Sequence, residues 1–294
     1  MKPDAYASPP ADFALERCRP LPIPRTVLVC RPDYFDVLDV KNDFMEGQVG
    51  EVDKTEARRQ WHGAVLAFRD CGMRVEMIEP TPGCEDMVFC ANPALPGLDA
   101  AGKKRCALGR MKHESRQREV PAFAAWFRAH GYDVAEVDGG VFEGGGDGVW
   151  HPGRGLIWGG FGGRSEPGAY AHLARIFGVP VILVELRPPF YHLDTCFCML
   201  DEETALVHPP AFTPESFRVI RRIVPRLIEA DPDEARGRLA CNAAAFLGTH
   251  VVIQSGCPKT AASLRAHGYR IFEVEAGEFL KSGGGVYCMK MALP

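Results

Sequence analysis

The sequence lacks the features that mark membrane, nucleic-acid-binding and exported proteins. None of its apolar runs approaches the ~20 residues that span a bilayer. Its formal net charge of −4 at pH 7 offers no basic surface to nucleic acid. Residues 1–10 carry neither an apolar signal core nor an Arg/Ser-rich transit pattern. We therefore expect a cytoplasmic protein that binds neither membranes nor nucleic acid.

Cysteine is present, but not in the pattern of a disulfide framework. The eleven cysteines are an odd number at scattered positions, which favours buried, reduced thiols. Cys196-x-Cys198, close to His192, is the nearest approach to a zinc motif, yet no second pair stands at ligand spacing. Alternate residues of a buried strand explain that pair better. The sequence thus predicts neither a metal nor another cofactor.

The order of elements along the chain predicts an α/β protein. Residues 1–24 contain six prolines and form an N-terminal extension that lies on the surface or is partly disordered. From residue 25 to 294, short strands such as 26–30 and 87–91 alternate with amphipathic helices such as 55–71. Pro225 should kink or break a helix over 214–230. No linker divides residues 25–294, so we expect a single domain.

Cys288 is the candidate nucleophile. It follows Ser282 and three glycines, whose backbone can turn sharply and approach a ligand closely. Backbone N–H groups in such a loop can also favour the thiolate, which is the attacking form. A buried structural cysteine is the competing interpretation.

A possible proton shuttle lies in the middle of the chain. His192 and Asp194 stand two residues apart near a predicted strand, so their side chains can share a face. A carboxylate beside an imidazole fixes its tautomer and stabilises its protonated form. A core histidine beside a turn aspartate explains the same residues equally well. With Cys288, this pair would supply a thiol nucleophile and its base.

Acidic residues around a glycine run suggest a pocket for a cation. Glu143 and Asp147 flank three glycines, but no Lys-Ser/Thr follows, as a phosphate loop requires. Together with Asp86 they suit a guanidinium group, which pairs well with carboxylates. Arg110 and Arg164, in loops at strand ends, could hold a substrate carboxylate or could be solvated surface arginines.

Taken together, these stretches resemble the guanidino-group-modifying enzymes: dimethylarginine dimethylaminohydrolases, arginine deiminases, arginine dihydrolases and amidinotransferases. The resemblance extends from about Thr26 to the C-terminus. Its motifs are Asp53-Lys54 with Gln60-Trp61, residues 86–92, 116–119, 142–147, 162–165, 190–196 and 282–288.

This resemblance implies a fold and a set of catalytic residues. The fold is a five-bladed α/β propeller, or pentein, of pseudo-fivefold ββαβ units around a central acidic site. By position, Cys288 matches the nucleophile, His192 the acid/base and Glu143 the carboxylate that orients the histidine. The glycine run has one residue more than the usual Glu-Gly-Gly-Asp, so Asp147 stays open as the alternative partner of His192.

The resemblance also implies how a substrate would be held. Asp86 and Asp194 match guanidinium-binding acids, and Phe89 matches the ring that packs on the substrate. Arg110 and Arg164 match the arginines that bind the α-carboxylate.

One position separates the activities within this group. Dimethylarginine hydrolases and deiminases carry a second aspartate where this chain has Asn92, and an asparagine there resembles the arginine dihydrolases. Pro93, directly after it, departs from the dihydrolase pattern and could reshape the pocket.

We therefore expect a cofactor-free hydrolase of arginine or an N-methylated arginine that works through a covalent Cys288–amidino intermediate. The first alternative is an amidinotransferase, in which an amine takes the amidino group in place of water. The second is a propeller without catalytic activity that only binds an amino acid. The expected partner is a small guanidino molecule, and the sequence leaves a homo-oligomer open.

Overall fold

The computed structural model describes residues 2–294, and these form five small β-sheets. Four of the five sheets repeat one pattern in chain order. A first strand pairs antiparallel with a second, a helix follows, and a third strand returns parallel to the second. The parallel return requires a crossover, and the helix supplies it.

The four units have the following bounds. The first is β4 (Ala94–Leu98), β5 (Lys104–Leu108), α3 (Val120–Ala129) and β6 (Asp133–Glu136). The second is β7 (Gly148–Trp150), β8 (Ile157–Phe161), α5 (Gly168–Phe177) and β9 (Val181–Glu185). The third is β10 (Phe197–Met199), β11 (Thr204–Val207), α6 (Pro214–Ile223) and β12 (Arg226–Glu229). The fourth is β13 (Ala244–Phe246), β14 (His250–Gln254), α8 (Pro258–Ala266) and β15 (Arg270–Val274).

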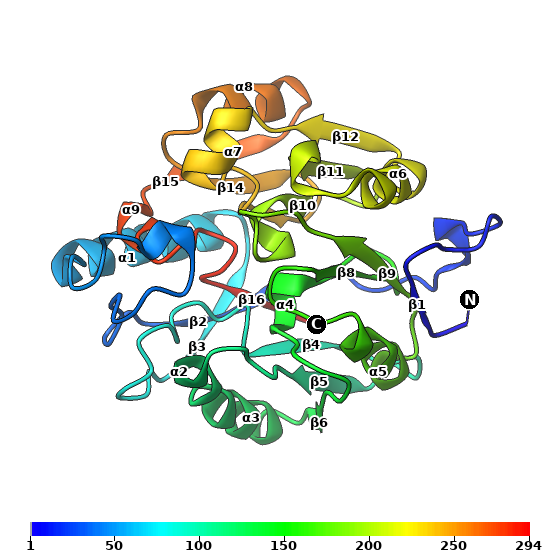
Figure 1. The fold of residues 1–294 in the computed structure, drawn as a ribbon, viewed down its shortest axis with the longest axis horizontal. Helices are drawn as coiled ribbons and strands as arrows, with labels where there is room; N and C mark the ends of the chain where they lie inside the picture. The colour runs from blue at the N-terminus through cyan, green and yellow to red at the C-terminus, as the bar shows by residue number, and fades with distance from the viewer. Residues whose placement is uncertain (1) are drawn as a thin grey trace.

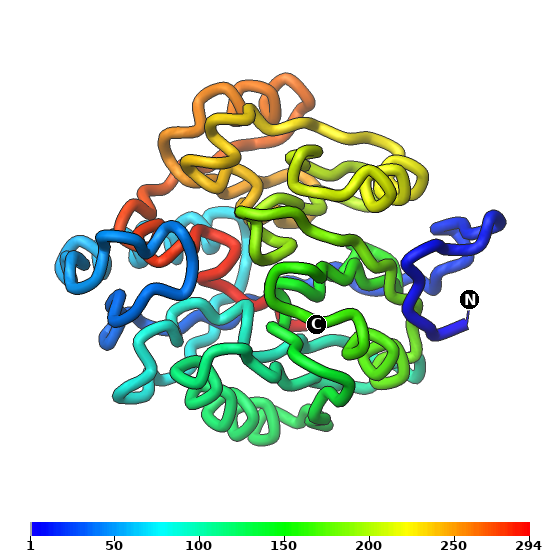
Figure 2. Tube along the Cα trace, viewed as in Figure 1, coloured from blue at the N-terminus to red at the C-terminus, as the bar shows by residue number. Residues whose placement is uncertain are grey.

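The fifth unit joins the two ends of the chain. Strand β2 (Thr26–Cys30) is followed by α1 (Lys54–Asp70) and by the parallel strand β3 (Arg74–Ile78). Its antiparallel partner is β16 (Met291–Leu293), the last strand of the chain. Figure 2 shows this C-terminal segment running into the middle of the molecule. Cys288 stands three residues before β16, so the strand pairing carries the cysteine inward.

The remaining elements are short and lie before, within or between the units. They are β1 (Ala5–Tyr6), η1 (Leu15–Arg17), η2 (Asp43–Met45), α2 (Glu114–Gln117), α4 (Gly144–Asp147), η3 (Leu193–Thr195), η4 (Pro209–Ala211), α7 (Pro232–Arg238) and α9 (Gly277–Leu280). In Figure 1 the helices α1, α3, α5, α6 and α8 lie toward the outside, and α4 lies near the middle.

The local sequence explains why α1 forms where it does. Asp53 caps the helix by accepting hydrogen bonds from the backbone N–H groups of Thr55 and Glu56. Trp61 and Phe68 are among the buried side chains that recur at helical spacing along it. The predicted helix over 55–71 is therefore confirmed to within one residue at each end.

The predicted break at Pro225 is confirmed, and a predicted strand is wrong. The helix predicted over 214–230 ends at Ile223, and β12 follows, because Pro225 cannot continue it. The strand predicted over 87–91 is wrong, since these residues form turns. Its apolar run is buried without a sheet partner, and two of the carbonyls there, those of Asp86 and Phe89, accept hydrogen bonds from Arg116. A side-chain donor thus replaces the ladder that the alternation suggested.

The N-terminal extension packs against the second sheet. Strand β1 adds to the edge of the second sheet by pairing parallel with β9. Tyr6, Phe13 and Leu15 pack against the core below it. This packing accounts for the order of a segment that has little periodicity of its own.

The prediction that the cysteines are buried and unpaired is confirmed for all eleven.

Among residues 2–294, no helix combines the length and the apolar character needed to cross a membrane.

Phe279 of α9 packs against two other aromatic rings, those of Phe35 and Phe89. Its buried ring stacks on Phe35 with centroids 5.0 Å apart and meets Phe89 edge-on at 6.2 Å. We expect Phe279→Ala to lower the free energy of unfolding by about 3–5 kcal/mol in urea titrations, because the cavity cannot collapse fully. Phe272→Ala, at a half-buried position, should cost less than about 2 kcal/mol. Equal losses in the two variants would contradict this assignment.

Candidate functional site

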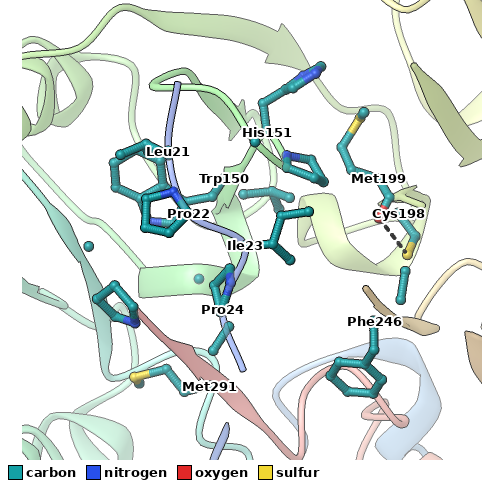
Figure 3. Close-up of a pocket in the computed structure, with 18 of the residues that line it drawn as sticks. Leu21, Pro22, Ile23, Pro24, Trp150, His151, Cys198, Met199, Phe246 and Met291 are labelled. Carbon is teal, nitrogen blue, oxygen red and sulfur yellow. Dashed lines mark hydrogen bonds between the residues drawn. The ribbon is translucent and has the colours of Figure 1, made fainter. Parts of the chain in front are cut away.

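The predicted site residues gather at one small cavity. An apolar cavity of about 180 Å³, lined by side chains such as Trp150, Met199 and Phe246, contains none of them (Figure 3). A second cavity of about 30 Å³ is lined by Cys288, His192 and other residues that the sequence singled out, namely Asp86, Phe89, Asn92 and Arg164. The chemistry therefore belongs to the smaller cavity, although the larger one offers more volume.

Cys288 sits on the inner wall with two hydrogen bonds to its sulfur. Its Sγ donates to Asp194 Oδ2 at 3.2 Å and accepts from Asn242 Nδ2 at 3.1 Å. Burial, followed by the charge of Asp194, raises the pKa of the Cys288 thiol well above its usual value. Both effects favour the neutral thiol over the thiolate. Asn242 was missed at the sequence level, where a single turn asparagine gives no signal.

The glycine run before Cys288 allows a close approach to an aromatic ring. A Cβ on Gly284 would lie 2.2 Å from a ring carbon of Phe89, so no larger residue fits there. Gly283 has φ of +77°, a conformation that favours glycine. The run therefore places the cysteine directly beside Phe89, as its composition suggested.

His192 is paired with a buried carboxylate. Its Nε2 lies 2.6 Å from Glu143 Oε2, and Glu143 Oε1 accepts from the backbone N–H of Lys112. Burial alone would raise the pKa of Glu143, but His192 and Arg164 hold it far below its ordinary value. Burial lowers the pKa of His192, yet Asp147 and Glu143 outweigh it and raise the pKa. The pairing thus favours a protonated imidazole.

Asp147, the alternative partner, bonds elsewhere. Its Oδ2 accepts from Ser165 Oγ at 2.6 Å, and its Oδ1 accepts from the backbone N–H of Leu193 at 3.0 Å. The extra glycine is absorbed in the single helical turn of α4, where Gly145 N–H donates to the carbonyl of Ala91. Of the two acids, the structure brings Glu143 rather than Asp147 to the imidazole.

Two carboxylate oxygens near the cavity lack a hydrogen bond. Asp194 Oδ1 has no partner, while Oδ2 of the same group takes the thiol. Asp86 Oδ1 accepts from Ser282 Oγ at 3.2 Å, and Asp86 Oδ2 has only an ion pair without hydrogen-bond geometry. Burial raises the pKa of Asp194 to about 6. Open acceptors on planar carboxylates are what the N–H groups of a guanidinium require.

Asn92 is oriented by an arginine that received no role at the sequence level. Arg116 Nη1 donates to Asn92 Oδ1 at 2.9 Å, which turns the amide nitrogen toward His192 Nδ1 at 3.4 Å. Arg116 is itself paired with Glu119 at 3.0 Å. The signal was available, because Arg116–Glu119 is one of the motifs that carry the family resemblance.

The two arginines expected to hold a carboxylate are separated. Arg164 lines the cavity, lies 3.3 Å from Glu143 Oε2 and packs over the ring of Tyr191. Arg110 is exposed and does not line the cavity; its backbone pairs with Phe142. The structure therefore brings Arg164, but not Arg110, to the cavity.

The character of the wall also differs from the expected acid-lined well. Asp86 is the one acid among the residues that line the cavity, beside the three bases Lys41, Arg116 and Arg164. Each base is paired with carboxylates at or behind the wall. Buried acids need such partners, because an unpaired buried charge is costly. Among residues 2–294, no group of three or more potential metal ligands is found.

Comparisons with known proteins agree with this geometry. The family model of eukaryotic N,N dimethylarginine dimethylhydrolase matches residues 31–293. The bifunctional arginine dihydrolase/ornithine cyclodeaminase ArgZ of Synechocystis sp. is 34% identical over 90% of this chain, which spans 37% of that protein's length. The N(G),N(G)-dimethylarginine dimethylaminohydrolase of Mycobacterium tuberculosis is 32% identical over 94% of this chain and 88% of its own.

Solved structures give the same grouping. The N-terminal domain of ArgZ, from a cyanobacterial ornithine–ammonia cycle and bound to product, superimposes with a TM-score of 0.86 at 33% identity, covering 92% of this chain and 97% of that one. An asparagine-to-serine variant of that domain is covalently bound to a reaction intermediate. The Pseudomonas aeruginosa dimethylarginine hydrolase, at 22% identity, shares the fold with a TM-score of 0.77 and covers 92% of this chain and all of that one. The chain belongs to the dimethylarginine dimethylaminohydrolase family of cysteine-dependent guanidino hydrolases.

Proposed function

We propose that this protein hydrolyses the guanidino group of arginine through a covalent amidino-thioether on Cys288. The observation that carries the proposal is the cavity at which a thiol, an imidazole–carboxylate pair and two carboxylate oxygens without hydrogen bonds meet. Asp86 and Asp194 would hold the guanidinium plane, and Phe89 would pack against it. Arg164 is the arginine left to bind the α-carboxylate.

The first half of the reaction follows from the charges around Cys288. The neutral thiol is stabilised by burial and by Asp194, and a bound guanidinium would offset that acid's charge and favour the thiolate. The thiol proton passes to Asp194 Oδ2, which already accepts it in a hydrogen bond, and the thiolate attacks the guanidinium carbon. His192 protonates the leaving amine, the C–N bond breaks, and the ammonia takes up the former thiol proton and leaves as ammonium. Glu143 holds the ring during this transfer and stabilises the imidazolium.

In the second half, water replaces the amine. His192, now neutral, accepts a proton from water as the water attacks the thioether carbon. The C–S bond breaks, Cys288 is regenerated and citrulline is released or retained. A second round on retained citrulline would yield ornithine, carbon dioxide and a second ammonia. Asn92 supports this dihydrolase course, since its amide replaces an acid that would clamp the guanidinium in one orientation.

The finer features of the fold are also part of this proposal. Five ββαβ units, closed by β16, support a five-bladed α/β propeller with the site on its axis. A single catalytic domain over residues 25–294 is consistent with the joined ends. The cytoplasmic location and a homo-oligomer stay predictions from the sequence.

The proposal is tested by product identification on a panel of arginine, mono- and dimethylarginine, agmatine and guanidino acids. We expect arginine to be consumed, with turnover in Cys288→Ser reduced at least about 10³-fold and in His192→Ala about 10²–10⁴-fold. Circular dichroism should show that both variants keep the fold. Full activity in either variant would end the assignment, and a new guanidino acid formed only with added glycine would identify a transferase instead.

Asn92→Asp should change which product accumulates. A carboxylate at this position adds a charge that favours a guanidinium over the neutral ureido group of citrulline. We expect the ornithine-to-citrulline ratio to fall, measured by amino-acid analysis during arginine turnover. A ratio that stays constant or rises would contradict the role given to Asn92.

The thiol pKa gives a test that needs no substrate. Asp194 opposes thiolate formation both by its charge and by accepting the thiol proton. Asp194→Asn should therefore lower the pH at which iodoacetamide labels half of Cys288. The extent of labelling is measured by peptide mass spectrometry. Asp86→Asn is the matched control, because that acid makes no bond to the sulfur. An unchanged or raised midpoint in Asp194→Asn would refute the proposed coupling.

A further inference from the structure

The proposed guanidinium site already contains a cation that belongs to the protein. Lys41 Nζ lies 3.2 Å from Asp86 Oδ2, 3.1 Å from Glu85 Oε1 and 2.5 Å from Asp39 Oδ1. The lysine side chain is only 2% exposed and lines the cavity beside Cys288. One of the two carboxylate oxygens left for a substrate therefore faces an ammonium.

The segment that carries Lys41 covers the cavity. The carbonyl of Lys41 accepts a hydrogen bond from Arg164 Nη2 at 2.9 Å, and Asn42 Nδ2 donates to the carbonyl of Ser282 at 3.1 Å. Met45, at the end of the same segment, also lines the cavity. The space that remains is about 30 Å³, which holds roughly two or three waters, at about 10–15 Å³ each, and not an amino-acid side chain. As it stands, the cavity is therefore too small for a guanidino amino acid.

An ammonium and a guanidinium cannot both occupy Asp86 without cost. Two like charges held this close in a partly buried site repel each other more strongly than they would in water. Burial lowers the pKa of Lys41, but Asp86, Asp39 and Glu85 outweigh it and raise the pKa, so the lysine stays charged at neutral pH. A substrate must therefore displace the ammonium or bind beside a like charge.

The two cations differ in what they offer the acids. A guanidinium is planar and presents N–H groups to two carboxylates at once, whereas an ammonium is compact and strongly hydrated. Lys41 leaves Asp194 Oδ1 unsatisfied, and a guanidinium could satisfy it together with Asp86. Once displaced, the Lys41 ammonium can remain on Asp39, whose side chain is 58% exposed, and regain water.

We propose that the Lys41 ammonium competes with the substrate guanidinium for Asp86 and thereby determines which ligands bind in the cavity. A cation that engages both Asp86 and Asp194 displaces the lysine, and a neutral ureido group of the same shape does not. The inference rests on the proposed function only for the choice of guanidinium as the ligand.

The test is equilibrium binding in a Cys288→Ser background, which removes turnover. L-arginine and L-citrulline are titrated by calorimetry, because they differ in side-chain charge and hardly in shape. Lys41→Met removes the ammonium at similar length, and Lys41→Arg keeps a cation. Lys54→Met is the matched control, since Lys54 Nζ pairs with Asp36 at 2.6 Å near the same segment and does not line the cavity.

We expect Lys41→Met to strengthen arginine binding about tenfold or more relative to citrulline, as removal of a like charge requires. Lys41→Arg and Lys54→Met should leave the arginine-to-citrulline preference within about threefold of the parent. Unchanged or weaker arginine binding in Lys41→Met, including no binding in any variant, would overturn the proposal. An equal gain in arginine affinity in Lys54→Met would also overturn the proposal. The cause would then be greater mobility of the segment that carries Lys41, and not the removal of its charge.

This outcome is independent of the proposed reaction. The affinities are measured without turnover, so they hold or fail whatever products the wild-type protein forms. Conversely, a wild-type protein that leaves arginine unchanged would refute the hydrolase and not the competition at Asp86.

Discussion

The charges around the small cavity lie out of water, so each carboxylate depends on a donor or a cation beside it. Glu143 has His192 and Arg164, Glu119 has Arg116, and Asp147 has the hydroxyl of Ser165. Together these partners neutralise most of the acids near the reaction centre. What remains is specific, namely one free oxygen on Asp194 and one on Asp86 that only an ammonium faces. Such a site can bind one additional cation whose shape matches these two oxygens, and it disfavours the binding of several cations.

The fold makes this arrangement possible by bringing distant segments to one place. The cavity is lined from six parts of the chain: 41–45, 86–92, residue 116, residue 164, 191–192 and 282–288. These segments are loops and short turns, and the sheets that carry them form a rigid frame. The pairing of β16 with β2 is the last step, since it fixes the glycine run and Cys288 against Phe89.

Much of the site was predictable because chemistry restricts which residues can perform it. A cysteine after three glycines, a histidine near acids and a glycine loop flanked by carboxylates each stood out by residue type and spacing. The resemblance favoured Glu143 as the partner of His192 but left Asp147 open, because only the tertiary structure shows which acid reaches the imidazole. The position of Arg110 outside the cavity was also not predictable, since a place at a strand end does not say which way the side chain points.

The sequence by itself indicated the α/β class of fold, predicted buried, unpaired cysteines and singled out the candidate reacting groups. These properties depend on periodicity, composition and intrinsic chemistry, which are local. Only the tertiary structure decided which acid meets His192, that Asn242 and Asp194 share the thiol, and that Lys41 occupies Asp86. Those are contacts across 40 or more residues, and they follow from the pairing of buried charges in three dimensions, which no local pattern encodes.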